Sequence, residues 1–136
     1  MRSILLAAFL VLAPAAQALE EADSGAIRQV IERQLEAFRR DDAAAAYAQA
    51  APSIQRLFPS EDVFMRMVRE GYAPVHRPQS VRFGESRDGP DGPQQAVLLR
   101  DAEGRNWIAL YSLEKQPDGT WKISGCTLTR EPGENA

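Results

Sequence analysis

The sequence predicts an α+β fold in which three N-terminal helices pack on a curved, four-stranded antiparallel sheet. Apolar residues recur at helical spacing as far as residue 72, and after residue 78 the apolar period changes to two. The later segments are joined by short turns, which is typical of an antiparallel meander, because parallel strands need longer connections. Helices that precede the strands, rather than alternate with them, indicate a segregated class with the helices on one face of the sheet.

The first two helices are predicted from periodicity and capping residues. Residues 24–40 carry a single apolar stripe, with charged residues in i, i+4 pairs on the opposite side. Either Asp23 or Ser24 can cap the start of this helix. A pair of aspartates then breaks the chain and can cap a second helix over residues 43–50, which Pro52 should stop.

The third helix and the strands are separated by a clear change in pattern. The helix should start after Ser60, a capping residue followed by two acidic residues, and end at Gly71 and Pro74. Turn sequences rich in Pro, Asp and Gly then divide a region with strand-like alternation. The four strands are expected over residues 81–84, 96–99, 106–114 and 121–130.

Two of these strands are apolar on both faces. On the third strand, Trp107 and Tyr111 point one way while Ile108 and Leu110 point the other, and the second strand is similar. A sheet with one face in water should alternate cleanly between apolar and polar residues. We therefore expect a partner to cover part of the outer face, most simply a second copy in a homodimer.

The first 18 residues predict a secretory signal peptide. Arg2 precedes an apolar run over residues 4–12, and Ala16-Gln17-Ala18 is a small-x-small cleavage site. The run is shorter than the about 20 residues that a spanning helix needs, so no membrane anchor is expected after cleavage. We expect export by the general secretory route to the periplasm or the medium. Residues 19–136 should then form one domain, with a frayed tail over residues 131–136.

Composition excludes several classes of function. The net charge is −3 and no basic block is present, whereas phosphate contacts supply most of the affinity of nucleic-acid-binding proteins. No phosphate-binding glycine loop and no cluster of metal-ligating side chains can be recognised. We therefore expect no nucleic acid, no metal and no cofactor.

Two long stretches resemble a known family. They are DDAAAAYAQAAPSIQRLFPSEDVFMRMVREGYAPVHRP and DAEGRNWIALYSLEKQPDGTWKISGCTL. Both are similar to the exported bacterial family catalogued as domain of unknown function 4864, above all in the spacing PxIxxxFxxxxxFMxMV, from Pro52 to Val68, and in the closing GxWxISGC. That family resembles the superfamily of nuclear transport factor 2 and ketosteroid isomerase. The resemblance implies a cone, with a bent sheet around a long first helix, often a pocket at the open end and often a dimer. It implies no activity.

Cys126 is the only cysteine, so it cannot form an internal disulfide. Strict alternation from Trp121 and Ile123 would point Cys126 outward, but a bulge near Gly125 would turn it toward the core. No histidine, cation or helix N-terminus lies nearby in sequence to activate the thiol. We expect a buried, inert cysteine; a cysteine at an interface or in an intermolecular disulfide, and a catalytic nucleophile, are the alternatives.

Pocket residues are harder to predict than the fold. His76 is the only histidine, and proton transfer through it would need an aspartate such as Asp41 or Asp42 within hydrogen-bond reach. Capping explains both aspartates more simply. Core packing is likewise the simpler interpretation of Trp107 and Tyr111. The candidates for the lining or rim of a pocket are Tyr72, His76, Trp107 and Tyr111.

The function expected from these observations is binding rather than catalysis. An exported soluble domain of this kind would hold a small apolar ligand in the cone, or a protein partner through its sheet. One alternative is a small enzyme of the isomerase or dehydratase type, although the carboxylates here fall at turns, caps and solvated faces. Another is a structural or assembly subunit that acts through the sheet face.

Overall fold

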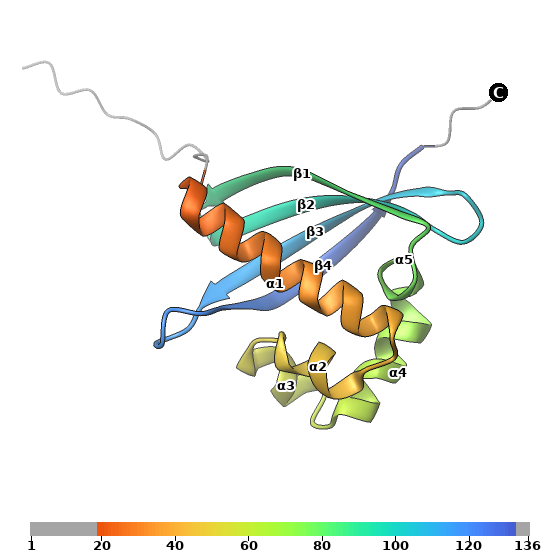
Figure 1. The fold of residues 1–136 in the computed structure, drawn as a ribbon, viewed down its shortest axis with the longest axis horizontal. Helices are drawn as coiled ribbons and strands as arrows, with labels where there is room; N and C mark the ends of the chain where they lie inside the picture. Colours follow the sequence, from red (N-terminus) through yellow and green to blue (C-terminus); the bar gives the residue numbers. More distant parts are fainter. Residues whose placement is uncertain (1–18, 133–136) are drawn as a thin grey trace, which may run out of the picture.

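A long first helix, α1 (Glu21–Arg39), lies across one face of a four-stranded antiparallel sheet (Figure 1). The structure is a computed structural model that describes residues 19–132, so the predicted signal peptide and the last four residues lie outside it. The shorter helices that follow are α2 (Ala43–Ala48), α3 (Pro52–Leu57), α4 (Glu61–Gly71) and α5 (Ala73–His76). The strands are β1 (Ser80–Gly89), β2 (Gly92–Arg100), β3 (Asn106–Lys115) and β4 (Trp121–Arg130), and they lie side by side in that order. The predicted α+β meander is confirmed.

Two short helices, α3 and α5, lie where the sequence predicted only helix ends. Pro52 is the first residue of α3, and Pro74 lies in the first turn of α5. A proline in a first turn is well tolerated, because the N–H group that it lacks has no helical partner there. Both prolines therefore open a new helix instead of only closing the previous one, and the expected number of three helices is wrong.

The capping predictions were right for two helices and wrong for one. Asp42 accepts a hydrogen bond from the Ala45 N–H group at 3.1 Å, and Ser60 accepts one from the Val63 N–H group at 3.2 Å. By contrast, α1 starts at Glu21, so Asp23 and Ser24 lie inside the helix rather than at its cap. Acidic residues near a helix N-terminus are stabilised by the helix dipole, and this is the role left to Asp23.

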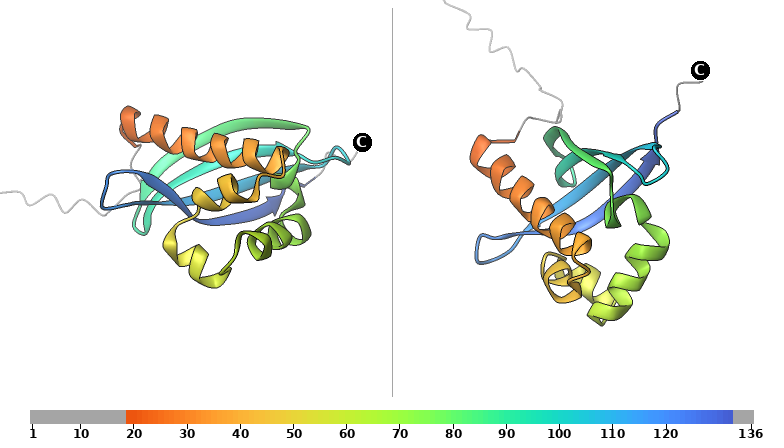
Figure 2. Two further views of the ribbon diagram at one scale, coloured as in Figure 1. Left: turned by 60° about the horizontal axis from the view of Figure 1, so that its bottom comes forward. Right: turned by 45° about the vertical axis from the view of Figure 1, so that its right-hand side comes forward.

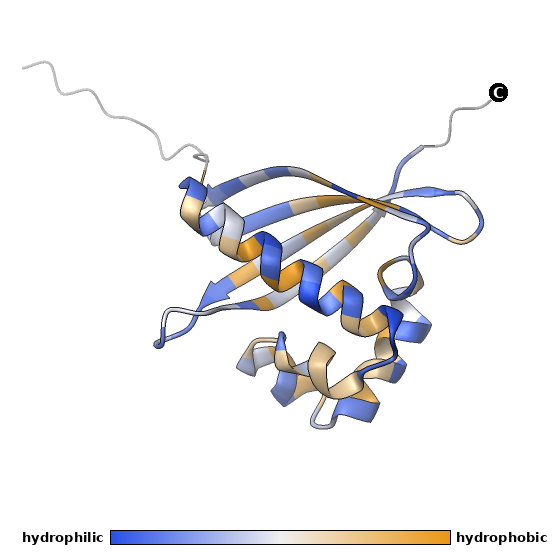
Figure 3. Ribbon diagram, viewed as in Figure 1, coloured by the Kyte–Doolittle hydropathy of each residue, from blue (hydrophilic) through white to orange (hydrophobic). Residues whose placement is uncertain are grey.

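The main core lies between α1 and the sheet. Ile27, Ile31 and Leu35 of α1 are buried against Val97 of β2 and Tyr111 of β3. Each such side chain contributes about 1.5–3 kcal/mol when it is fully buried. Figure 3 shows hydrophobic residues along α1 and in the middle of the strands, with hydrophilic residues toward the strand ends. None of the helices within residues 19–132 is long and apolar enough to cross a membrane.

A second core lies beyond the end of α1, among the short helices. Phe38 at the end of α1 lies with its ring centroid 6.2 Å from that of Phe64 on α4, and the Tyr47 ring lies 5.6 Å from Phe64. Figure 2 shows these helices gathered at one end of the molecule, beside β4 and away from the start of α1. The two cores are separate clusters, and Tyr72 packs against both of them.

A bulge in β4 decides which way its second half faces. Ser112 of β3 pairs with Gly125, whereas the next residue, Leu113, pairs with Ile123, so Ser124 has no partner across the ladder. One extra residue moves every later side chain to the other face. Cys126 therefore lies opposite Tyr111, on the inner face of the sheet. This confirms the alternative in which a bulge turns the cysteine toward the core.

The outer face of the sheet is apolar but partly covered within one chain. Ile108 and Leu110 are half-buried. Leu98 lies over Gly84 of β1, where an added Cβ atom would be 3.0 Å from its Cδ1 atom. The glycine leaves room for this leucine, so part of the two-faced apolar pattern is explained by packing along the sheet itself. A second copy on this face remains a prediction.

Candidate ligand-binding cavity

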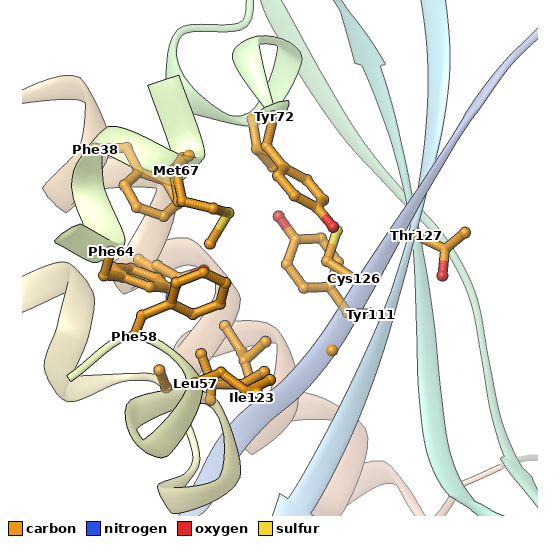
Figure 4. A pocket seen from close by; sticks show the side chains of 16 residues that line it. Phe38, Leu57, Phe58, Phe64, Met67, Tyr72, Tyr111, Ile123, Cys126 and Thr127 are labelled. Carbon is orange, nitrogen blue, oxygen red and sulfur yellow. The ribbon is translucent and has the colours of Figure 1, made fainter. Parts of the chain in front are cut away.

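An apolar cavity of about 560 Å³ lies between the short helices and the inner face of β3 and β4 (Figure 4). It occupies the space between the two cores. Sheet residues form one wall, and the helices form the other. The helical wall consists of Gln34, Phe38, Ala50, Ile54, Leu57, Phe58, Phe64, Met67, Val68, Tyr72 and Val75, and the sheet wall of Tyr111, Ile123, Gly125, Cys126 and Thr127.

Backbone hydrogen bonds to β4 hold the helical wall in place. The Ala51 N–H group donates to the Ile123 carbonyl, and the Ile123 N–H group donates to the Gln49 carbonyl, both at 2.8 Å. Lys122 Nζ also donates to the Ala48 carbonyl at 2.6 Å. These bonds form a short parallel bridge around Ala50, which fixes the start of α3 against the edge of the sheet.

The Tyr47 side chain positions the next part of this wall. Its hydroxyl donates to the carbonyl oxygen of Phe58 at 2.7 Å and lies 3.1 Å from that of Gln55. The Gln55 side-chain amide in turn donates to the Tyr47 carbonyl at 3.0 Å. The Phe58 ring is thereby held against Phe64, with ring centroids 6.3 Å apart in an edge-to-face arrangement.

The two motifs behind the family resemblance meet at this cavity. From PxIxxxFxxxxxFMxMV, five of the seven specified residues line it, all except Pro52 and Met65: Ile54, Phe58, Phe64, Met67 and Val68. From GxWxISGC, three residues of β4 line the opposite wall: Ile123, Gly125 and Cys126. Sequence reasoning misses these helical residues as site candidates, because their spacing also fits the buried side of an ordinary amphipathic helix. The family motif is the sequence feature that could have identified them as site residues.

Tyr111, Cys126 and Thr127 are the polar residues at the sheet wall, and Figure 4 shows the Thr127 side chain directed away from the cavity. Tyr111 is only 1% exposed, and its hydroxyl has no hydrogen-bond partner within residues 19–132. Burial raises the pKa of Tyr111 well above its ordinary value, and the neighbouring Cys126 adds to this. The thiol is close enough to affect the pKa of Tyr111. The Tyr111 hydroxyl nevertheless has no partner that meets hydrogen-bond geometry within residues 19–132.

Burial keeps the Cys126 thiol in its protonated form. Burial raises the pKa of Cys126 to about 12, although the nearby Tyr111 hydroxyl works in the opposite direction. At neutral pH the sulfur is therefore protonated, and a protonated thiol is neither a nucleophile nor a metal ligand. Cys126 is half-buried and free of any disulfide. A role for Cys126 in packing stays a prediction.

Two of the four pocket candidates line the cavity, and two do not. Tyr72, between α4 and α5, faces the cavity from the helical side, and Tyr111 faces it from the sheet (Figure 4). Trp107 instead lies near the β2–β3 turn, where its indole N–H group donates to Asp101 at 2.9 Å. Burial works against ionisation of Asp101, but hydrogen bonds from Trp107 and Arg105 outweigh it and lower the pKa of Asp101 to about 2.

His76 pairs with an aspartate, but outside the cavity. Its Nε2 atom lies 2.8 Å from the Oδ1 atom of Asp41, which is the partner that an acid–base role would need. Arg69 and Arg77 bind the same carboxylate, so Asp41 joins the end of α1 to α4 and α5. The hydrogen bond from His76 is the largest cause of the lowered pKa of Asp41. The His76 ring lies beside Phe38, with centroids 6.5 Å apart, and neither His76 nor Asp41 lines the cavity.

The cavity holds no charged group among the residues that the structure describes. Its lining includes no Asp, Glu, Lys, Arg or His, and no group of metal-ligating side chains is found within residues 19–132. Gln34 contributes an amide, but its nitrogen already donates to the Ala46 carbonyl at 3.1 Å. Such a lining can bind an uncharged molecule, and it offers no acid–base pair for catalysis.

Comparison with known proteins agrees with the resemblance seen in the sequence. No curated protein and no solved structure matches the chain. One family model, described as a domain of unknown function (DUF4864), matches residues 20–136. The match covers the helices, the sheet and both motifs that line the cavity, and the chain therefore belongs to the DUF4864 family.

Proposed function

We propose that the protein binds a small, uncharged and largely apolar molecule in the cavity between the short helices and β4. The cavity itself supports this most directly. Its volume of about 560 Å³ lies within the range of about 300–1,000 Å³ that is typical of small-molecule sites. Protein interiors are otherwise close-packed, so an apolar space of this size leaves wall residues without contacts that a ligand can supply.

The mouth of the cavity gives a ligand a way in. Leu57 is 70% exposed and lines the cavity, so an apolar side chain stands in water at its rim. Release of water from Leu57 and from the half-buried Met67 would favour binding of an apolar molecule by about 25 cal/mol for each Å² that becomes buried. No cation in the described lining favours an anionic ligand, and no carboxylate favours a cationic one.

The same geometry argues for binding over catalysis. An isomerase or dehydratase of the kind considered from the sequence needs a base beside its substrate. The described lining contains no carboxylate or imidazole, and the His76–Asp41 pair belongs to a different part of the molecule. We also propose that the chain belongs to the nuclear transport factor 2 and ketosteroid isomerase superfamily, with the long α1 on a bent sheet as support, and that residues 1–18 direct its export.

Binding of Nile red, an uncharged fluorescent dye, tests the proposal. We expect saturable binding of one dye per cavity, with the blue-shifted emission of an apolar site. Met67→Trp places a bulky indole ring in the cavity and should weaken this binding. Val63→Trp is the matched control, because it adds the same side chain to the same helix at a position that is 42% exposed and does not line the cavity. Equal dye binding by the two variants would refute the proposed site.

A further inference from the structure

The Tyr111 hydroxyl is a buried donor without a partner, and it belongs to the cavity wall. Its side chain is 1% exposed, and within residues 19–132 the hydroxyl makes no hydrogen bond. Figure 4 shows the ring rising from the sheet with its hydroxyl directed toward Met67 and Tyr72 on the helical side. Most buried polar groups in proteins are hydrogen-bonded, so a single exception needs an explanation.

Packing alone does not explain this hydroxyl. Phenylalanine would present the same ring to α1 and β2, and it would leave no buried polar atom unsatisfied. The neighbouring Cys126 offers only a weak sulfur acceptor and lies outside hydrogen-bond geometry. A molecule bound in the cavity can supply the missing partner.

We propose that the Tyr111 hydroxyl is the hydrogen-bonding anchor of the cavity, and that the ligand is an uncharged lipophile with an oxygen acceptor such as a ketone, ester or ether. This inference rests on the proposed function and adds the chemical class of the ligand. Burial keeps this hydroxyl protonated at physiological pH, so it has a proton to donate to a ligand oxygen. The lack of any cation in the described lining excludes a carboxylate as the preferred acceptor.

Tyr72 completes the polar end of the cavity. It faces the same space from the helical side, where its ring reaches toward Cys126 (Figure 4). The other walls are aliphatic or aromatic, with Phe58 and Phe64 opposite the sheet. A ligand bound with its oxygen at Tyr111 would place its apolar body between these two rings and Ile123, and aromatic bodies suit such walls.

Benzophenone and diphenylmethane test the anchor, because they differ only in one carbonyl group. The measured quantity is the ratio of their dissociation constants in wild-type protein, in Tyr111→Phe and in Tyr47→Phe. We expect Tyr111→Phe to weaken benzophenone relative to diphenylmethane by about fivefold, the effect of one net hydrogen bond. The infrared carbonyl band of bound benzophenone should lie lower in wild-type protein than in Tyr111→Phe. Tyr47→Phe removes a hydroxyl that supports the wall from behind, through the Phe58 carbonyl, so it should weaken both compounds to the same extent and leave their ratio unchanged.

The outcomes separate this inference from the proposed function. If both compounds bind and Met67→Trp weakens their binding, but Tyr111→Phe changes neither the ratio nor the carbonyl band, the cavity binds ligands and the anchor is refuted. A water molecule held by Tyr111 would give that result. If neither compound binds wild-type protein, the proposed function and the anchor are both overturned. Circular dichroism of each variant verifies that it is folded.

Discussion

Replacement of Tyr111 by Phe should make the ligand-free protein more stable. The side chain is almost fully buried, so the ring contacts are kept and only the oxygen is removed. An unsatisfied buried hydroxyl costs about 1–3 kcal/mol of desolvation, against which a weak contact with the Cys126 thiol offsets only a few tenths. We expect the free energy of unfolding to rise by about 1–2 kcal/mol, or roughly 3–6 °C in Tm for a domain of this size.

Urea unfolding followed by circular dichroism measures this change, and Tyr47→Phe provides the opposite case. The Tyr47 hydroxyl donates to a backbone carbonyl at 2.7 Å, so its removal should lower the free energy of unfolding by about 1 kcal/mol. The same substitution thus has opposite signs at two positions. If Tyr111→Phe were as destabilising as Tyr47→Phe, the Tyr111 hydroxyl would have a good partner and the reasoning would be wrong.

Three further predictions concern other parts of the molecule. Because burial raises the pKa of Cys126 to about 12, Ellman's reagent should label it at pH 8 only in denaturant, and rapid labelling of folded protein would contradict this. The pKa of Asp101 is lowered from 3.8 to about 2, so its stabilising effect is complete above pH 4 and is lost as pH falls toward 2. Asp101→Asn should flatten the stability curve in that window, and an unchanged slope would refute the assignment. Sedimentation should show a dimer that Leu110→Glu dissociates, and a monomeric wild-type protein would rule out the second copy.

Periodicity was enough to predict the class and order of the fold, because burial of one face determines the spacing of apolar residues. It was not enough to predict α3 and α5. A proline ends one helix and can begin the next, and only the following contacts decide between these roles. The start of α1 was missed for a similar reason, since Glu20 caps it without a side-chain hydrogen bond that a capping pattern could reveal.

The candidate site was only half predictable. Strand alternation placed Tyr111 on the inner face, and a bulge at the following strand was needed to place Cys126 beside it. His76 and Trp107 were candidates by residue type. Their partners, Asp41 and Asp101, take them into other hydrogen-bond networks, and a pairing such as His76 with Asp41, 35 residues apart, leaves no local pattern.

The cavity could not be predicted at all from apolar spacing. The same spacing of Phe58, Phe64 and Met67 describes a helix packed directly on a sheet and a helix held away from it. The parallel bridge between Ala50 and Ile123 is a long-range backbone contact that holds the start of α3 at the edge of β4, and apolar spacing does not reveal it. Whether space remains after packing depends on such distances and not on residue type.

Native mass spectrometry tests the central claim most directly. The wild-type protein and Met67→Trp would each be isolated gently from the cells that make them, without detergent, and exposed to the same cell extract. The account predicts that the folded wild-type protein carries the added mass of one small uncharged molecule, and that a smaller fraction of Met67→Trp carries it. An equal ligand-bound fraction in the two proteins would contradict it.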